Sequence, residues 1–239
     1  MRKQILIIIC IIVLGIIIGV NVTEKKESAV VSNLNITNIK DTIPKVALTF
    51  DDGPSSRYTE KLLDGLKERD VKATFFVMGE SVSENSEIIK RMYEDGHLIG
   101  NHTYTHADLA KTDFNTACRE INETNSCISN ITGYTPKYIR PPYGDWDQRL
   151  LEETDMSVVL WTIDPEDWKD QNAGIVASRV LKSVRSGDII LLHDIFKSSV
   201  DAALIIIDKL QDKGYHFVTV DKINNKKIIN NQETKETKK

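Results

Sequence analysis

Two adjacent carboxylates, Asp51 and Asp52, end an apolar run in this sequence, and such a pair can do acid–base chemistry. The run Val46–Phe50 has the pattern of a buried strand, and Gly53 directly after the pair stops it. Two like charges at the end of a buried strand repel each other unless something positive lies beside them. The pair therefore indicates a site at which one carboxylate binds a cation while its neighbour takes up a proton.

Two histidines spaced four residues apart, His102 and His106, offer nitrogen ligands for such a cation. On a helical turn, side chains at this spacing face the same way, and we expect both rings to do so. Two imidazoles and one carboxylate are a common ligand set for a catalytic divalent metal, because they leave positions open for water and substrate. The Glu of the H-E-x-x-H motif is missing, which argues against a zincin protease.

Short apolar runs alternate with amphipathic segments from Lys45 onward, which is the pattern of a parallel α/β fold, open or closed into a barrel. We predict strands over residues 46–50, 73–77, 98–101, 138–140, 158–163, 188–192 and 217–220. We predict helices over residues 59–69, 86–95, 113–131, 147–154, 174–185 and 200–213. In such folds the carboxyl ends of the strands meet at one rim, where the chemistry sits.

Five of the predicted strand ends carry residues that can do chemistry. Besides the Asp pair and the two histidines, the later strands end on Arg140, on D-P-E-D-W with Asp167 and Trp168, and on His193. His193 can protonate a leaving group, Asp167 can orient and stabilise that imidazole, and Arg140 can hold the free aspartate. An aspartyl phosphatase is a rival interpretation, but that class needs an acid where Gly53 stands.

Five short motifs follow one another in order within residues 45–221: TFDDG, HTYTH, RPPY, DPEDW and LLH. Together they resemble those of the polysaccharide deacetylases of the NodB-homology type, carbohydrate esterase family 4. The resemblance implies a distorted (β/α)7 barrel that removes acetyl groups from N-acetylated sugars. It also implies a divalent metal, with Zn²⁺ as first choice and Co²⁺ or another divalent ion as alternatives.

The motif match also implies roles for individual residues. The implied metal ligands are Asp52, His102 and His106. Asp51 would be the base and His193 the acid, with Arg140 paired to Asp51 and Asp167 tuning His193.

The match implies substrate contacts as well. The backbone N–H of Tyr143 would help to hold the oxyanion, and Trp168 and Leu191 would line the acetyl pocket. Intact Asp51 and His193 argue against a non-catalytic glycan-binding module, which is the alternative from another functional class, because a pure binder needs neither.

Charge is unevenly spread along the 239 residues, whose formal net charge is −4. Residues 1–44 carry a net +2 and residues 222–239 a net +4, which leaves about −10 on residues 45–221. A segment as acidic as residues 45–221 is a poor candidate for binding nucleic acid.

The first residues have the pattern of a membrane segment. Arg2 and Lys3 precede an uncharged apolar run over residues 5–20. A helix of this kind, at ~1.5 Å per residue, crosses most of the ~30 Å hydrocarbon core. No A-x-A cleavage pattern lies between Gly15 and Ser28, so we predict an uncleaved transmembrane helix, with a cleaved signal peptide as the alternative. The positive-inside rule puts the rest of the chain outside the cell.

The predicted organisation is an anchor or signal segment over 1–22, a linker over 23–44, a deacetylase domain over 45–221 and a polar basic tail over 222–239. We expect a monomeric, single-pass membrane protein with its catalytic domain outside, or a secreted protein if the segment is cleaved. The expected substrate is a cell-envelope polysaccharide, with peptidoglycan as first choice. Chitooligosaccharides or an exopolysaccharide are the alternatives.

Overall fold

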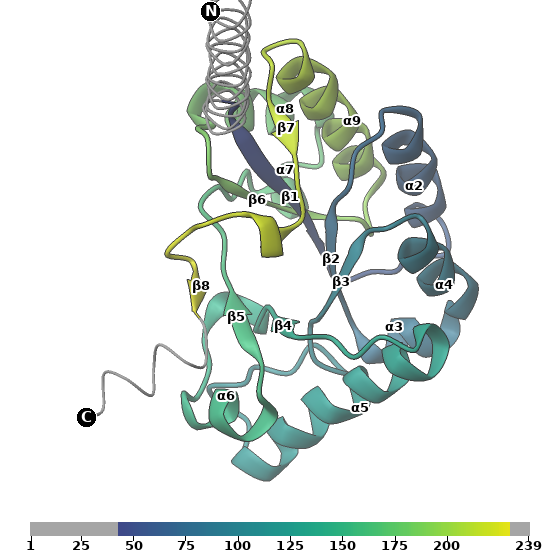
Figure 1. Cartoon of the computed structure of the whole chain (residues 1–239), viewed down its shortest axis with the longest axis vertical. Coiled ribbons are helices and arrows are strands. Elements are labelled where there is room, and N and C mark those ends of the chain that lie inside the picture. The colour runs from purple at the N-terminus through teal and green to yellow at the C-terminus, as the bar shows by residue number, and fades with distance from the viewer. Residues whose placement is uncertain (1–42, 230–239) are drawn as a thin grey trace, which may run out of the picture. The chain divides into compact units, whose positions relative to one another are not determined.

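Strands and helices alternate along residues 43–229, which are the residues that this computed structural model describes (Figure 1). The strands are β1 (Lys45–Asp51), β2 (Thr74–Val77), β3 (Leu98–Asn101), β4 (Tyr138–Ile139), β5 (Ser157–Val159), β6 (Ile189–His193), β7 (His216–Phe217) and β8 (Ile228–Ile229). The helices are α2 (Thr59–Glu68), α3 (Gly79–Glu84), α4 (Ser86–Glu94), α5 (Phe114–Thr132), α6 (Arg149–Thr154), α7 (Asp167–Asp170), α8 (Ala173–Ser183) and α9 (Lys197–Gln211).

The strands form one sheet in the order β6-β1-β2-β3-β4-β5-β8. Neighbours from β6 through β5 are parallel, and β8 runs antiparallel to β5. The short β7 pairs in parallel with the first two residues of β1. The sheet is curled, because Thr162 and Ile163, which follow β5, return to hydrogen bond with β6. Figure 1 shows helices α2, α4, α5 and α9 along the outside of this sheet.

The predicted parallel α/β fold is confirmed, and the predicted distorted (β/α)7 barrel takes the form of a curled half-barrel sheet with helices, which the described residues do not close completely. The physical reason is the shortness of the later strands. β4 and β7 have two residues each and β5 has three. Between β5 and β6 the strand ladder is therefore reduced to the single bridge that joins Ile163 and Ile190.

The predicted domain boundary at residue 221 leaves out β8. Ile228 and Ile229 pair with Val159 and Val158 of β5, and Ile223 is buried. Ile223, Ile228 and Ile229 of the predicted polar tail therefore contribute to the core or to the sheet. Two isoleucines among lysines and asparagines are too short a signal to predict a strand.

Several predicted segments lie outside the described residues: the anchor over 1–22, most of the linker over 23–44, and residues 230–239 of the tail. Within residues 43–229, no helix combines the length and the apolar character that a membrane crossing requires.

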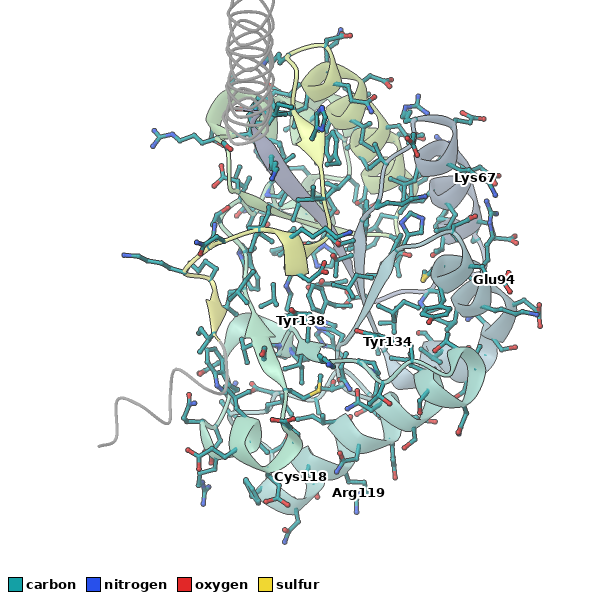
Figure 2. All side chains as sticks on the ribbon, viewed as in Figure 1. Lys67, Glu94, Cys118, Arg119, Tyr134 and Tyr138 are labelled. Carbon is teal, nitrogen blue, oxygen red and sulfur yellow. The ribbon has the colours of Figure 1, made fainter. Side chains whose placement is uncertain are left out.

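The helices cover the sheet with one apolar face each. In α2, Leu62, Leu63 and Leu66 are fully buried, whereas Lys67 is exposed on the outer side of the helix (Figure 2). Strand β1 is buried along almost its whole length, which explains its nearly continuous apolar sequence. Polar side chains are consequently concentrated where the strands end, and the site forms there.

Candidate active site and metal centre

Strand register brings the polar strand ends together. Asp51 of β1 is the register partner of His193 of β6, so these two side chains start from neighbouring positions on one rim. Asn101 of β3 is likewise the partner of Ile139 of β4, and His102 and Arg140 are the next residues along each strand. The expected convergence of strand ends is therefore present.

The side chains of Asp52, His102 and His106 form a group whose ligand atoms all lie within 4.8 Å of one another. Oδ1 of Asp52 lies 3.3 Å from Nε2 of His102 and 3.4 Å from Nε2 of His106. This oxygen is buried and has no hydrogen-bond partner among residues 43–229. Burial raises the pKa of Asp52, but His102 and the other nearby histidines outweigh it and lower that pKa. An ionised, unpartnered carboxylate oxygen facing two imidazole nitrogens fits a divalent metal.

The orientation of the His102 ring is set by the ring nitrogen that faces away from Asp52. Its Nδ1 lies 2.6 Å from the carbonyl oxygen of Arg140, so we assign the ring proton to Nδ1 and leave the Nε2 lone pair facing Asp52. Burial, with repulsion from His102, lowers the pKa of His106. Both rings are thus suited to act as neutral metal ligands.

The prediction that a helical turn aligns the two histidines is wrong. The loop after β3 is irregular, and Thr103 and His106 both adopt left-handed backbone conformations, with φ of 63° and 60°. Oδ1 of Asn101 accepts a hydrogen bond from the N–H of Thr103 at 2.7 Å. The Glu120 carboxylate, from α5, accepts hydrogen bonds from the backbone N–H groups of Tyr104 and Thr105 at 2.8 and 2.7 Å. Sequence reasoning gave neither anchor a role: Asn101 directly precedes His102, and Glu120 lies outside the motifs.

The turn after β1 is shaped by a close approach between Gly53 and Asp194. A Cβ on Gly53 would lie 2.2 Å from Oδ1 of Asp194, so only glycine fits. Asp194 is fully buried and its other oxygen accepts a hydrogen bond from the Thr59 hydroxyl. Burial raises the pKa of Asp194 to about 7. Asp52, just before this glycine, has a left-handed backbone with φ of 71°. This strained turn sets the orientation of the Asp52 carboxylate.

Arg140 holds Asp51 from inside the sheet. Its Nη1 donates to Oδ1 of Asp51 and to Oγ1 of Thr49, each at 2.8 Å. Its Nε and Nη2 donate to the carbonyls of Val159 and Leu160. The guanidinium is fully buried. The other oxygen of Asp51 stays free of Arg140 and faces His102 at 4.0 Å.

We expect Arg140→Met to destabilise the protein by about 3–5 kcal/mol, because Asp51 would be left as a buried charge without its partner. Urea unfolding followed by circular dichroism would measure this. Arg149→Met is the matched control, since Arg149 pairs with Asp147 at the surface and its loss should change the unfolding midpoint little. Equal stability of Arg140→Met and the unaltered protein would contradict the assigned ion pair.

His193 is held by a second buried carboxylate. Nδ1 of His193 lies 2.8 Å from Oδ1 of Asp167, and the His193 backbone N–H donates to the other oxygen of Asp167 at 2.8 Å. Burial lowers the pKa of His193, but Asp167, supported by Asp51 and Asp52, outweighs this and raises it to about 9. The imidazole is therefore protonated at neutral pH and can serve as an acid.

These groups face a pocket of about 440 Å³ at the rim. The three predicted substrate residues lie in its wall: Tyr143, which is 71% exposed, Trp168, which is 51% exposed, and the buried Leu191. The Tyr143 ring also meets the ring of His106 edge-on, with centroids 5.1 Å apart. Two further wall residues, Pro141 and Asp164, belong to the RPPY and DPEDW motifs, whereas Trp161 and Phe196 were not predicted from the sequence.

Comparison with known proteins gives a consistent family match. A family model described as polysaccharide deacetylase matches residues 38–158. The peptidoglycan-N-acetylglucosamine deacetylase PgdA of Listeria monocytogenes is 42% identical over 184 residues, which are 77% of this chain and 40% of PgdA. The peptidoglycan-N-acetylmuramic acid deacetylase PdaC of Bacillus subtilis is 44% identical over 178 residues, which are 74% of this chain and 38% of PdaC. The chain thus spans less than half the length of these two relatives.

The fold is shared with a solved structure as well. The structure of peptidoglycan deacetylase PdaC from Bacillus subtilis superposes with a TM-score of 0.75 at 41% identity, over 82% of this chain and 94% of the PdaC chain.

Proposed function

Because this chain belongs to the polysaccharide deacetylase family, we propose that it hydrolyses N-acetyl groups on N-acetylglucosamine residues of a cell-envelope polysaccharide, with peptidoglycan as first choice. One observation carries the proposal. Asp51 and the three candidate metal ligands face the same pocket as His193, whose pKa is raised to about 9. An amide hydrolysis needs these three elements: an electrophile, a base for water and an acid for the leaving amine.

Asp52, His102 and His106 would hold the metal, for which we propose Zn²⁺, with Co²⁺ or another divalent ion as alternatives. Three ligands of N and O type with an open side suit a catalytic zinc site. When bound, the ion would supply Lewis-acid polarisation of the substrate carbonyl and of an attacking water.

We assign the base to Asp51. It is ion-paired to the buried Arg140 on one oxygen, and its second oxygen lies on the same side as His102. Arg140 fixes the orientation of the carboxylate, so Asp51 is placed to take a proton from water as it attacks the acetyl carbon. The backbone N–H of Tyr143 is the proposed donor to the resulting oxyanion.

We assign the acid to His193. Its Nε2 is the ring nitrogen not engaged by Asp167, so a proton at that atom can pass to the departing sugar nitrogen. The products would be acetate and a glucosamine residue. Trp168 and Tyr143 offer exposed aromatic faces for sugar rings, and Leu191 offers an apolar contact for the acetyl methyl group.

Asp167→Asn should shift the alkaline limb of the kcat profile to lower pH. The acid form of His193 is present below its pKa and is lost as pH rises through that value, which is about 9 with Asp167 in place. Without the Asp167 charge, burial dominates and lowers the pKa of His193. Profiles of kcat against pH from 6 to 10 would measure the shift. Asp170→Asn is the control, because Asp170 lies on the same helix but pairs with Arg179. An alkaline limb that stays in place in Asp167→Asn would remove His193 from the acid role.

We further propose that the chain is a monomer tethered to the cell membrane with its catalytic part outside. The support is the apolar run over residues 5–20 behind Arg2 and Lys3. External protease on intact cells should release a soluble active fragment that begins within residues 23–44. A chain beginning at residues 20–30 in untreated medium would instead show a cleaved signal peptide.

Acetate release from a substrate panel tests the proposed function. The panel holds peptidoglycan glycan strands, chitin oligomers and an acetylated exopolysaccharide, and fragment mass spectrometry of the reduced products shows which sugar has lost its acetyl group. We expect free glucosamine in peptidoglycan strands. If only muramic acid residues carried a free amine, the activity would instead be N-acetylmuramic acid deacetylation, the reaction for which PdaC is named. Action on chitin oligomers only would support the chitooligosaccharide alternative, and binding without acetate release would support a glycan-binding module.

A further inference from the structure

A buried carboxylate that the proposed reaction does not use lies directly after the proposed acid. Asp194 follows His193 at the end of β6, and its side chain is fully buried. Among residues 43–229, Thr59 is the only side chain that hydrogen bonds to Asp194, and Oδ1 of Asp194 has no hydrogen-bond partner. Burying a carboxylate without a positively charged partner costs free energy. Fold stability therefore does not explain why a carboxylate stands at this position.

The hydrogen bonds of Asp194 lead to the turn after β1. Oγ1 of Thr59 donates to Oδ2 of Asp194 and accepts from the backbone N–H of Ser55 at 2.7 Å. The direction is fixed, because a backbone N–H can only donate, which leaves the single hydroxyl proton of Thr59 for the carboxylate. Thr59 is fully buried, and Ser55 follows the proposed metal ligand Asp52 by three residues. This Asp194–Thr59–Ser55 link therefore joins the end of β6 to the turn that carries Asp52.

The same turn is held from two sides at Gly53. On one side, the Asp194 carboxyl group packs so closely against Gly53 that a Cβ has no room. On the other side, the backbone N–H of Met78 donates to the Gly53 carbonyl at 3.0 Å. The backbone of Gly53 is not left-handed, so the contact with Asp194, and not the backbone conformation, excludes a larger residue. The Asp194 side chain consequently sets how closely the turn approaches β6.

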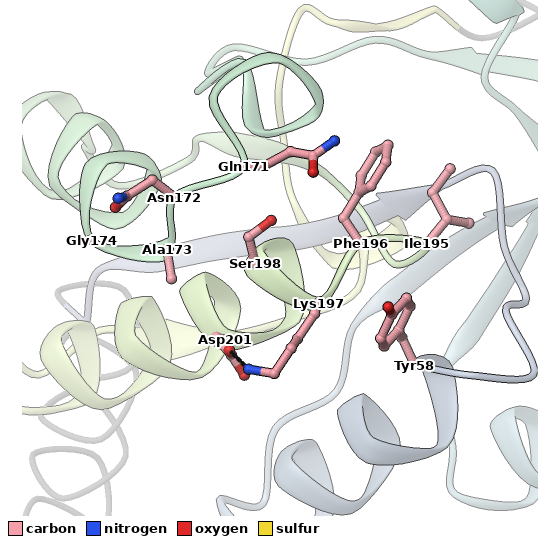
Figure 3. A pocket seen from close by; sticks show the side chains of 10 residues that line it. All are labelled: Tyr58, Gln171, Asn172, Ala173, Gly174, Ile195, Phe196, Lys197, Ser198 and Asp201. Atoms are coloured by element: carbon pink, nitrogen blue, oxygen red, sulfur yellow. Dashed lines mark hydrogen bonds and ion pairs between the residues drawn. The ribbon is translucent and has the colours of Figure 1, made fainter.

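The residues next to the link border open space. Figure 3 shows Tyr58, which precedes Thr59, in the wall of one hollow together with Ile195 and Phe196, which follow Asp194. On this side the turn and the end of β6 are therefore not wedged together by packed side chains. The hydrogen bonds of the link are what connects them there.

We propose that Asp194 and Thr59 are positioning residues for the metal ligand and for the acid–base pair. The link fixes the turn that carries Asp51 and Asp52 against the strand that carries His193. The inference rests on the proposed function. Neither Asp194 nor Thr59 belongs to the wall of the catalytic pocket, so both act through the residues that they hold. Metal affinity depends on the orientation of Asp52, and the reaction needs Asp51 and His193 at a fixed separation, so loss of the link should impair both.

Thr59→Val tests the link, because it replaces the hydroxyl by a methyl group of similar size. The full chain is stripped of metal and loaded with Co²⁺, whose visible absorption bands report the geometry of its ligands. In Thr59→Val the bands should shift, the dissociation constant for Co²⁺ should rise by about 10–100-fold, and kcat should fall by a similar factor at unchanged KM. A mere loss of folded protein would lower the band intensity without moving the bands or the dissociation constant. Thr59→Ser keeps the hydroxyl and should restore all three values.

Ser199→Ala is the matched control. Ser199 is also a fully buried hydroxyl, on the first turn of α9, but it has no hydrogen-bond partner among residues 43–229 and no part in the link. It should leave the bands, the dissociation constant and kcat unchanged. Unshifted bands and an unchanged dissociation constant in Thr59→Val would overturn the positioning role. Failure of the proposed function is separately visible, because the unaltered Co²⁺-loaded chain would then release no acetate from N-acetylglucosamine oligomers while its bands still responded to Thr59→Val.

Hydrogen exchange at the Ser55 amide tests the link in the unaltered chain, without metal or turnover. The Ser55 N–H donates to a buried hydroxyl, so it should exchange slowly with solvent, as measured by nuclear magnetic resonance on the metal-free protein. Exchange as fast as that of an unprotected amide would overturn the link, including in the case that Thr59→Val does not fold.

Discussion

Asp52→Ala is expected to abolish both metal binding and acetate release. The reason is geometric, since Oδ1 of Asp52 is the buried oxygen that faces His102 and His106 at 3.3 and 3.4 Å. Two imidazoles alone offer an incomplete ligand set for a catalytic divalent ion. Metal content of the purified protein, measured by elemental mass spectrometry, and acetate release on the same sample are the two readouts. His106→Ala should give the same pair of losses.

Asp164→Ala is the matched control for this variant. Asp164 is another carboxylate in the wall of the same pocket, but it lies outside the three-ligand group. It should keep one metal per chain. Full metal content in Asp52→Ala, with activity retained, would show that the ligand assignment is wrong.

Asp51→Asn is expected to keep the metal and to lower kcat by about 10²–10⁴, the scale of a lost general base. Asparagine keeps an oxygen that can accept from Arg140, so the positions of the neighbouring groups are preserved while the proton acceptor is lost. Rate measurements at saturating substrate separate this loss from weaker substrate binding.

Thr49→Val distinguishes loss of the base from disturbance of Arg140. Thr49 also accepts a hydrogen bond from Nη1 of Arg140, at the same 2.8 Å, but carries no proton acceptor for catalysis. It should retain most of its turnover number. Loss of metal in Asp51→Asn would point to a ligand role for this aspartate instead.

The position of the site could be predicted from sequence because its residues follow buried strands. Strands buried on both faces give continuous apolar runs, and the runs ending at Phe50 and Leu192 are easily found. The parallel register then makes Asp51 and His193 neighbours, although they are far apart in the chain. The rim could be predicted because several of these strand ends carry residue types that can do chemistry.

Loop geometry could not be predicted in the same way. The His102–His106 spacing predicts a helical turn, whereas the loop depends on two left-handed residues and on Glu120, which reaches it from α5. The contact between Glu120 and the loop depends on how α5 packs, and no local pattern in the sequence predicts it. The motif spacing therefore predicts two histidines that do lie close together, but it predicts the wrong backbone between them.

The aromatic walls of the pocket were likewise only partly predicted. Tyr143 and Trp168 lie within recognised motifs, whereas Trp161 and Phe196 enter the wall because the chain bends back to β6 after β5 and then turns into α9. Which side of such a bend faces the site is set by the curl of the whole sheet. Periodicity within a short segment does not reveal that curl.

Stoichiometric metal reconstitution tests the central claim most directly. The full chain is stripped with a chelator, Zn²⁺ is added back in fractions of an equivalent, and acetate release from N-acetylglucosamine oligomers is measured at each step. We expect no activity in the stripped protein, and a linear rise in activity that stops at one equivalent of Zn²⁺, with one free amine formed per acetate. Full activity in the stripped protein, or a rise that ends only at two equivalents, would contradict a single metal centre at Asp52, His102 and His106.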